Sequence, residues 1–187
     1  MARSATFTWR STDDTQDFGR RLGALLRGGD LLVLTGDLGA GKTTLTQGIA
    51  EGLGVRGPIT SPTFVIARVH PSLVGGPALV HVDAYRLGSA LELDDLDLDA
   101  DLDASVTVVE WGAGLAEQLS EERLELTLTG EDVRAVHAHG VGPRWDAVLD
   151  ALAEPTAEPT ADLADGAAAD SADGGAADSA DGATATS

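Results

Sequence analysis

The sequence predicts an α/β domain of three layers, in which helices flank a central sheet of parallel and antiparallel strands. Three observations support this fold class. An apolar run leads through a glycine-rich segment into a pattern of helical spacing. Two further runs, 79–82 and 105–110, have the character of buried strands. Strand-like segments also form neighbouring pairs, 65–70 with 79–82 and 123–129 with 133–139, and such hairpin-like pairs require antiparallel pairing.

The first part of the chain alternates between strand and helix patterns. The predicted elements are a strand at 5–9, a helix at 12–27, a strand at 30–35 and a helix from Lys42 to about Leu53. Ser11 or Thr12 is suited to cap the first helix, because a hydroxyl there accepts a hydrogen bond from a free backbone N–H. Glycines follow both predicted helices, as expected at helix ends.

The second part of the chain is richer in strands. The predicted elements are strands at 65–70, 79–82, 105–110, 123–129 and 133–139, a short helix at 113–119 and a last helix at 143–152. Residues 88–104 interleave leucine with acidic residues and predict short helical turns with a solvated acidic face. A Ca²⁺ loop in this segment is disfavoured, because the glycine and the distant glutamate of such loops are missing.

The composition is strongly acidic, with 31 acidic residues against 12 basic ones and a net charge of −19. This balance argues against tight, direct binding to bare nucleic acid, which needs lysine and arginine to neutralise phosphates. There is no cysteine, which excludes disulfides and cysteine-ligated metals. No apolar run has membrane-spanning length and the N-terminus has no apolar signal region, so we expect a cytoplasmic protein without membrane contact.

A change of composition divides the chain into two parts. Residues 1–153 predict one domain of this α/β class, whereas residues 154–187 are dominated by alanine, aspartate, glycine, serine, threonine and proline. The same seven residues occur at 168–174 and again at 176–182. Because this tail has almost no large apolar side chains to bury, we expect it to be a disordered acidic segment.

The glycine-rich segment Gly36–Thr43 (GDLGAGKT) lies between a predicted buried strand and a predicted helix, which is the context of a phosphate-binding loop. Its glycines let the backbone approach a polyphosphate, and its N–H groups attract anions together with the helix N-terminus. Lys42, the only lysine in the chain, is placed to reach the β- and γ-phosphates. The Thr43 hydroxyl is placed to join a Mg²⁺ shell. The predicted fold is therefore of the P-loop nucleoside triphosphatase type.

Hydrolysis also needs acids for Mg²⁺ and for the attacking water, and two strand ends supply them. Asp83 lies at the carboxyl end of a strand, where open α/β sheets place ligand sites, so we predict that it holds Mg²⁺ rather than merely capping a turn. Glu110 also ends a buried strand, where an ionised carboxylate is costly unless a cation or water uses it. The next residue, Trp111, either lines the cleft or belongs to the core.

A candidate switch follows the phosphate-loop helix at Ser61–Phe64 (SPTF). The hydroxyls of Ser61 and Thr63 are candidates for sensing the γ-phosphate. A simple turn before a strand is the alternative.

Taken together, these motifs resemble the TsaE (YjeE-type) family of bacterial P-loop ATPases. The matching motifs are the glycine-rich loop, Ser61–Phe64 (SPTF), His81–Leu87 (HVDAYRL) and Val109–Trp111 (VEW). The loop is generic, but the other three in this order are specific, and the resemblance covers roughly residues 5–150.

The resemblance implies Mg²⁺-dependent ATP hydrolysis that supports threonylcarbamoylation of adenosine 37 in tRNAs reading codons that begin with A. It implies action with the proteins TsaD and TsaB, so that tRNA is involved only indirectly. It implies catalytic roles for Lys42, Asp83 and Glu110, and magnesium ligation by Thr43, Asp83 and Glu110. The nucleotide-binding residues that it implies are Asp37, Leu38, Gly39, Ala40, Gly41, Lys42, Thr43, Thr44 and Trp111.

Two points qualify the resemblance. Many relatives carry an acid soon after the Glu-Trp pair, whereas Gly112 and Ala113 follow here, so any role of that acid is absent or moved. The alternative function is a small-molecule P-loop kinase, although such enzymes usually need an arginine-rich lid and an acceptor pocket. A GTPase is disfavoured, because the Asn-Lys-x-Asp guanine motif is absent.

Overall fold

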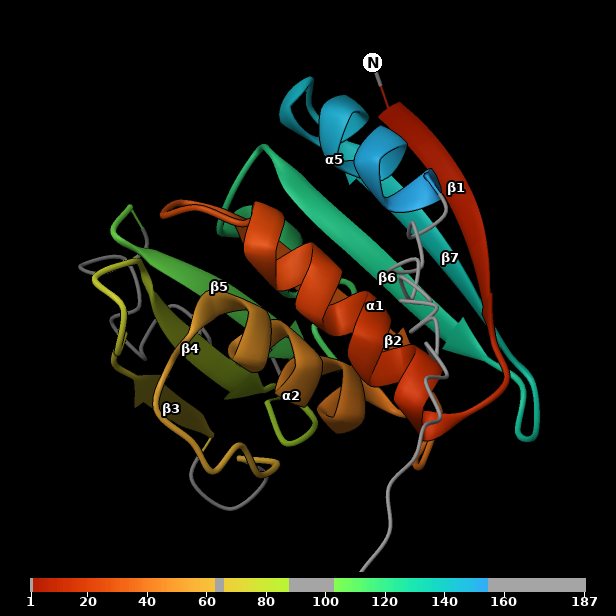
Figure 1. Cartoon of the computed structure of the whole chain (residues 1–187), viewed down its shortest axis with the longest axis horizontal. Helices are drawn as coiled ribbons and strands as arrows, with labels where there is room; N and C mark the ends of the chain where they lie inside the picture. Colours follow the sequence, from red (N-terminus) through yellow and green to blue (C-terminus); the bar gives the residue numbers. More distant parts are fainter. Residues whose placement is uncertain (1, 63–65, 88–102, 155–187) are drawn as a thin grey trace, which may run out of the picture. The chain divides into compact units, whose positions relative to one another are not determined.

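A mixed β-sheet forms the centre of the domain, and α-helices gather on one side of it (Figure 1). The computed structural model describes residues 2–62, 66–87 and 103–154. Within these ranges the elements are β1 (Ala2–Trp9), α1 (Thr12–Leu25), β2 (Leu31–Gly36), α2 (Lys42–Leu53), β3 (Ala67–His70), β4 (Ala78–Asp83), β5 (Ser105–Glu110), the 3-10 helix η1 (Ala116–Gln118), β6 (Arg123–Thr129), β7 (Arg134–Val141) and α5 (Arg144–Ala153).

The described strands form one seven-stranded sheet in the order β1-β7-β6-β2-β5-β4-β3. β2 lies in the middle, parallel to β6 on one side and to β5 on the other, and β5 is parallel to β4. The pairs β3–β4, β6–β7 and β1–β7 are antiparallel. The predicted mixed sheet is therefore confirmed. The two strands of each predicted hairpin-like pair are neighbours in the sheet and antiparallel.

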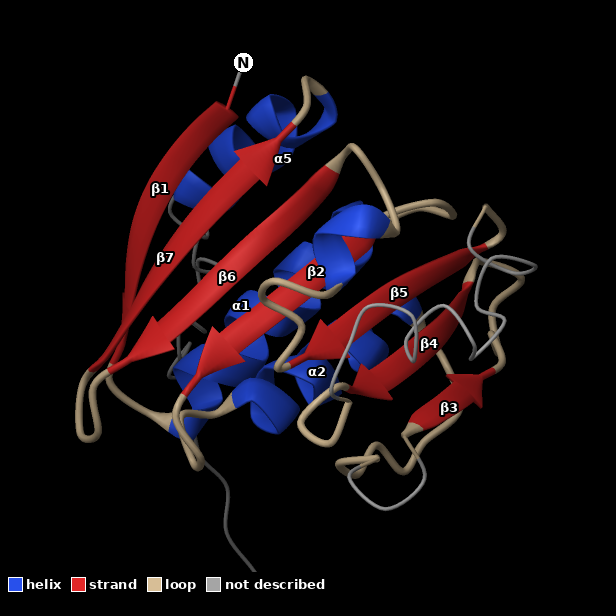
Figure 2. Cartoon of the chain, turned by 180° about the vertical axis from the view of Figure 1, so that it is seen from behind, coloured by secondary structure: helices blue, strands red, loops and turns tan. Residues whose placement is uncertain are grey.

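The two faces of the sheet are covered differently. Helices α1, α2 and α5 lie on one face, and Figure 2 shows the opposite face with these helices behind it. Strand alternation divides the core accordingly: Leu32 and Leu34 of β2 pack in the larger cluster with the helices, while Leu31 and Val33 pack in a smaller cluster. Ala116 of η1 belongs to the smaller cluster. Among the described residues, the third layer of the predicted fold is thus this short 3-10 helix.

Helices α1 and α2 approach each other through glycine. A Cβ atom added to Gly19 or Gly23 of α1 would lie 2.7 Å or 2.3 Å from a backbone oxygen of α2. A Cβ atom added to Gly48 or Gly52 of α2 would lie 2.4 Å or 2.2 Å from a backbone oxygen of α1. Real Cβ atoms do not approach other atoms this closely, so the contact requires glycine at all four positions.

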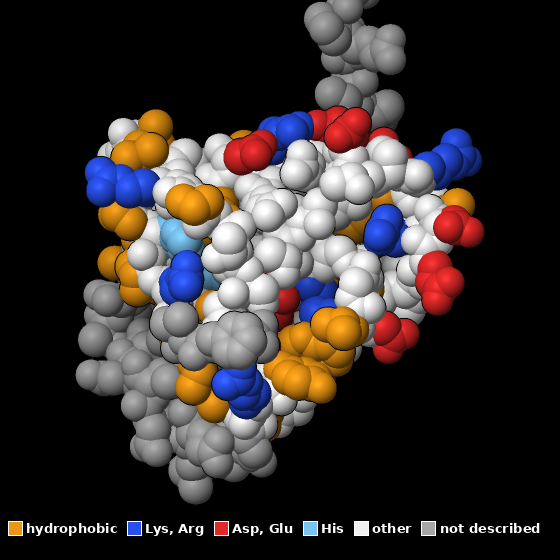
Figure 3. Space-filling model, turned by 90° about the horizontal axis from the view of Figure 1, so that it is seen from below, with side chains coloured by type: hydrophobic (Ala, Val, Ile, Leu, Met, Phe, Trp, Pro, Cys, Tyr) orange, Lys and Arg blue, Asp and Glu red, His pale blue; other side chains and the backbone are white. Residues whose placement is uncertain are grey.

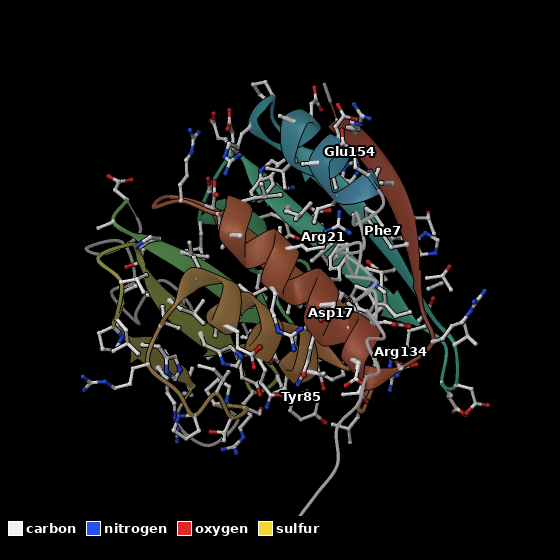
Figure 4. All side chains as sticks on the ribbon, in the orientation of Figure 1. Phe7, Asp17, Arg21, Tyr85, Arg134 and Glu154 are labelled. Atoms are coloured by element: carbon white, nitrogen blue, oxygen red, sulfur yellow. The ribbon has the colours of Figure 1, made fainter. Side chains whose placement is uncertain are left out.

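The last helix, α5, is attached at both ends by arginines. Arg144 donates to the Asp30 carboxylate at 2.9 Å and to the Leu25 carbonyl at 2.7 Å, next to the C-terminus of α1. At the other end of α5, Arg21 of α1 donates to the carbonyls of Ala151, Leu152 and Glu154. Figure 4 shows Arg21 on α1 and Glu154 at the end of α5. These bonds satisfy carbonyls that a helix C-terminus leaves without intrahelical partners.

The predicted elements agree with the structure apart from their bounds. β1 begins earlier than predicted, at Ala2, because it pairs along the whole of β7 from Ala2 with Val141 to Trp9 with Arg134. The helix predicted at 113–119 is the shorter η1. Apart from Glu154, the predicted disordered tail at 154–187 lies outside the described residues, as do nearly all of the predicted acidic turns at 88–104. In the part of the chain that is described, no helix has both the length and the apolar character needed to cross a membrane.

Candidate nucleotide-binding site

The phosphate-binding loop joins β2 to α2 with the conformation that its glycines permit. Gly39 and Gly41 have φ values of 83° and 102°, in the left-handed region that favours glycine. Gly41 is the N-cap of α2, so the loop delivers the chain directly to the N-terminus of a twelve-residue helix. Free N–H groups at such a terminus attract anions.

Lys42 lies almost buried at the start of α2, with 4% of its surface exposed. Its Nζ donates to the carbonyls of Gly36 at 2.7 Å and Asp37 at 2.9 Å, and it lies 3.9 Å from the centre of the Trp111 ring. Burial lowers the pKa of Lys42, while the carboxylates of Glu110, Asp83 and Asp37 oppose that shift. The two carbonyl bonds use two of the three ammonium protons, which leaves one for a ligand in the adjoining pocket.

Asp83 and Glu110 lie side by side at the carboxyl ends of β4 and β5. Their Cα atoms are register partners in the parallel ladder, and Glu110 is also the register partner of Leu34 near the end of β2. Both carboxylates are buried, with 4% and 2% of the residue surface exposed. Parallel strands therefore bring both acids to the edge of the sheet where the phosphate loop begins.

Hydrogen bonds link these acids to the loop helix and to neighbouring segments. The Thr43 hydroxyl donates to Glu110 Oε1 at 3.1 Å, with Oε2 at 3.3 Å, and His81 Nε2 lies 2.8 Å from Glu110 Oε1. The Ser61 hydroxyl donates to Asp83 Oδ2 at 3.2 Å, and the backbone N–H of Tyr85 donates to Asp83 Oδ1 at 2.9 Å. The two acids and the hydroxyl of Thr43 are thus held close together.

A pocket of about 410 Å³ opens at this end of the molecule. Figure 3 views this end and shows acidic and basic side chains beside a hydrophobic patch. The lining residues are Leu38, Gly39, Gly41, Lys42, Thr43, Thr44, Ser61, Asp83, Tyr85, Glu110 and Trp111. A volume of several hundred Å³ with a few charged groups at its base is typical of a small-molecule site.

Two aromatic rings form one wall of the pocket. Trp111 has a φ of 61°, which is unusual for a residue other than glycine. Its backbone N–H donates to the Leu34 carbonyl at 2.9 Å. The Tyr85 ring lies 5.1 Å from the Trp111 ring, tilted by 59°. Of the two alternatives for Trp111, the structure therefore favours a cleft-lining position over a place in the core.

The donor set of the pocket fits a magnesium ion. Thr43, Asp83 and Glu110 offer oxygen atoms only, and Mg²⁺ prefers oxygen ligands. No group of three or more His, Cys, Asp or Glu side chains suited to hold a metal occurs among the described residues. A magnesium ion at this place would therefore rely on phosphate and water for much of its shell, as this ion usually does.

Most of the predicted site residues meet in this pocket. Asp37 and Ala40 do not line it; they line a second cleft of about 210 Å³ on the β6–β7 side of the loop, together with 128–131. Ser61 of the predicted switch lines the main pocket, whereas Thr63 lies outside the described residues. Placement alone does not test a chemical role, so the roles of these residues stay predictions.

Three residues near the site were given no role in the sequence analysis. His81 contacts Glu110. The sequence carries a signal that His81 lies near the site, because residues two apart on a strand share a face and Asp83 is a predicted site residue. Tyr85 follows Asp83 closely, in the same motif. Arg134 of β7, labelled in Figure 4, donates to the Ala40 carbonyl at 2.9 Å, a contact between distant segments that no local pattern indicates.

Comparisons with known proteins give the relatives of this chain. The sequence model of the family described as threonylcarbamoyl adenosine biosynthesis protein TsaE matches residues 9–137. A protein named tRNA threonylcarbamoyladenosine biosynthesis protein TsaE from Streptomyces coelicolor is 61% identical over 137 residues, which are 70% of this chain and 93% of that protein. One of the same name from Bacillus subtilis is 38% identical over 149 residues, covering 77% and 92%. The crystal structure of Bacillus subtilis YdiB superposes with a TM-score of 0.66 at 33% identity, covering 81% and 95%.

Proposed function

The chain belongs to the TsaE family, and we propose that it binds ATP with Mg²⁺ and hydrolyses it in support of tRNA threonylcarbamoyladenosine biosynthesis. The biosynthetic role follows the names of its relatives, whereas ATP hydrolysis is our inference from the site. The observation that carries it is the 3.1 Å bond between Thr43, at the start of the phosphate-loop helix, and Glu110, at a strand end. Asp83 lies beside Glu110 in the same ladder.

We assign the binding of the triphosphate to the loop and to Lys42. The backbone N–H groups of the loop and the N-terminus of α2 attract phosphate oxygens, and the buried ammonium of Lys42 supplies the positive charge. Thr43, Asp83 and Glu110 would hold the magnesium ion, directly or through water. When bound, that ion neutralises charge on the phosphate oxygens.

We assign the hydrolytic step to Glu110. Its carboxylate lines the pocket, is buried, and accepts hydrogen bonds from Thr43 and His81. A carboxylate in this position can accept a proton from the attacking water or orient that water. Ser61 donates to Asp83, so the candidate switch segment contacts the acid predicted to hold magnesium.

The proposed partners are TsaD and TsaB, with tRNA involved only through that complex. The net charge of −19 supports an indirect role, because a strongly acidic chain is repelled by the phosphates of tRNA. We expect the purified chain to capture TsaD- and TsaB-like proteins in a pull-down, and to do so differently with and without ATP. Strong tRNA binding by the isolated chain would contradict this assignment.

Phosphate release from ATP by the purified chain tests the catalytic proposal. We expect release that requires Mg²⁺, and a loss of about 100-fold or more in kcat for Glu110→Gln with ATP affinity retained. Glutamine keeps the volume and one acceptor oxygen of Glu110 but cannot take a proton. The matched control is Glu121→Gln, an exposed carboxylate outside the pocket, which should leave kcat unchanged.

Two results would contradict the proposal. Unchanged turnover in Glu110→Gln would remove Glu110 from the hydrolytic step. Transfer of the γ-phosphate to a small acceptor by the chain alone, in place of release to water, would favour the kinase alternative.

A further inference from the structure

Glu110 has a second buried partner in addition to Thr43. His81 of β4 is fully buried, and its Nε2 lies 2.8 Å from Glu110 Oε1. Glu110 lines the pocket, whereas His81 does not. The carboxylate therefore lies between a ring inside the protein and the space that a ligand would occupy.

The chemistry of a carboxylate identifies the donor of this bond. An ionised carboxylate only accepts hydrogen bonds, so Nε2 of His81 carries the proton. Nδ1 of the same ring is buried and has no hydrogen-bond partner among the described residues. An N–H group at Nδ1 would be left unpaired at a cost of about 1–3 kcal/mol, so the hydrogen bonds favour the arrangement with the proton on Nε2.

Three elements hold the carboxylate from different directions. Thr43 donates from the first turn of α2, His81 donates from β4, and Glu110 itself extends from the end of β5. A glutamate side chain has three rotatable torsions, and a single hydrogen bond does not fix them all. Two donors from separate elements restrict the carboxylate to one orientation, in which it faces Thr43 and the pocket.

We propose that His81 is a positioning residue for Glu110: it holds the carboxylate in the orientation needed for hydrolysis without touching the nucleotide. This inference rests on the hydrolytic role proposed for Glu110. Strand β4 then contributes two residues to the site, because His81 and Asp83 lie two residues apart on the same face of the strand. One acid of the pocket is supplied by this strand and the other is oriented by it.

A matched pair of substitutions tests the proposal by steady-state kinetics. Gln keeps a donor near the place of Nε2, whereas Leu is similar in size and has none. We expect His81→Leu to lower kcat by about 10- to 100-fold, with the KM for ATP changed by less than about threefold. We expect His81→Gln to stay within about threefold of the unchanged protein, and His70→Gln, at a buried histidine away from the pocket, to leave kcat unchanged.

A double variant separates positioning from general damage. If His81 acts only through Glu110, adding His81→Leu to Glu110→Gln should lower kcat no further. A further loss in the double variant, an unaltered kcat in His81→Leu, or equal losses in His81→Leu and His81→Gln would each overturn the proposal.

A structure of the His81→Leu protein tests positioning independently of activity. We expect Glu110 to turn away from Thr43, so that the 3.1 Å bond is lost. A Glu110 side chain that keeps this bond would overturn the proposal. Absence of ATP hydrolysis by the unchanged protein, or full activity of Glu110→Gln, would instead refute the proposed function, so the two failures are distinguishable.

Discussion

Helix α2 takes part in two contacts of opposite chemistry, one with α1 along its middle and one with the strand ends at its N-terminus. At the contact with α1 the backbones of the two helices meet at Gly48 and Gly52, where there is no room for a side chain. The contact at the N-terminus is made by charged and polar side chains, among them Lys42 and Glu110, which are nearly as buried as the core.

The difference separates stability from ligand chemistry within one helix. Close backbone packing gains van der Waals contact and buries no charge, so we assign to it the positioning of α2. Buried charges at the N-terminus lose hydration that their partners only partly replace. The lowered pKa of Lys42 is a sign of this cost, and such groups are expected where a ligand completes the site.

The largest expected effect comes from breaking the glycine contact. In Gly52→Ala the new Cβ atom would lie 2.2 Å from the Arg20 carbonyl oxygen, so the two helices must move apart. We expect the free energy of unfolding to fall by about 3 kcal/mol, measured by urea denaturation. The control is Gly76→Ala, whose Cβ atom would meet its nearest neighbour at 3.8 Å and should change stability by less than about 0.5 kcal/mol.

Gly48→Ala tests whether the two contacts of α2 are coupled, because Gly48 lies nearer to the pocket than Gly52 does. A rigid displacement of α2 at Gly48 would change the position of Thr43 relative to Glu110, so we expect ATP affinity to fall along with stability. If Gly48→Ala lost stability but bound ATP as tightly as before, the two contacts of α2 would be mechanically independent.

The next prediction concerns the contact at the N-terminus of α2, where a substitution should weaken ATP binding without lowering the free energy of unfolding. Lys42→Met keeps the length of the side chain and removes its buried charge. We expect ATP affinity to fall by about 100-fold, since the cation for the phosphates is lost. The free energy of unfolding should stay the same or rise by up to about 1 kcal/mol. A clear loss of stability would mean that the Lys42 bonds to the loop carbonyls hold the loop together.

The smallest expected effect involves a buried polar group outside both contacts. His70 of β3 has 7% of its surface exposed, and Nδ1 lies 3.1 Å from the Arg56 carbonyl. Burial lowers the pKa of His70 below its ordinary 6.5, although the Arg56 carbonyl opposes the shift. Below pH 6.5 the unfolded chain therefore takes up a proton before the folded chain does, and stability falls as the pH falls.

Denaturation of the unchanged protein and of His70→Gln between pH 7 and pH 5 measures the contribution of His70 to the pH dependence of stability. The unchanged protein should lose stability relative to the variant by less than about 1.4 kcal/mol per pH unit. Parallel curves for the two proteins would show that His70 does not contribute.

Local patterns in the sequence sufficed for much of the fold and for the loop. Gly36–Thr43 is contiguous, and each flanking element carries its own hydrophobic pattern, so β2, the loop and α2 were predictable. Asp83 and Glu110 were predictable as strand-end acids for the same reason. The close approach of α1 and α2 at Gly19, Gly23, Gly48 and Gly52 was not predicted from the sequence.

Contacts between distant segments were not predictable in this way. The donation from His81 to Glu110 depends on β4 and β5 being neighbours in parallel register. The position of β1 at the edge beside β7 likewise depends on the whole sheet, and residues 5–9 alone indicate a strand but not its partner. Such pairings are chosen by tertiary packing, which a single sequence does not display.

The strand order has a consequence for how the chain reaches its folded state. β1 pairs with β7, and the central β2 lies between β5 and β6. The strands β1 and β2 therefore pair with segments that follow them in the sequence by about 70 to 140 residues. Loop-closure entropy must be overcome before those pairings form, so we expect folding in milliseconds to seconds. On the ribosome, neither edge of β2 can be covered until most of the domain has emerged.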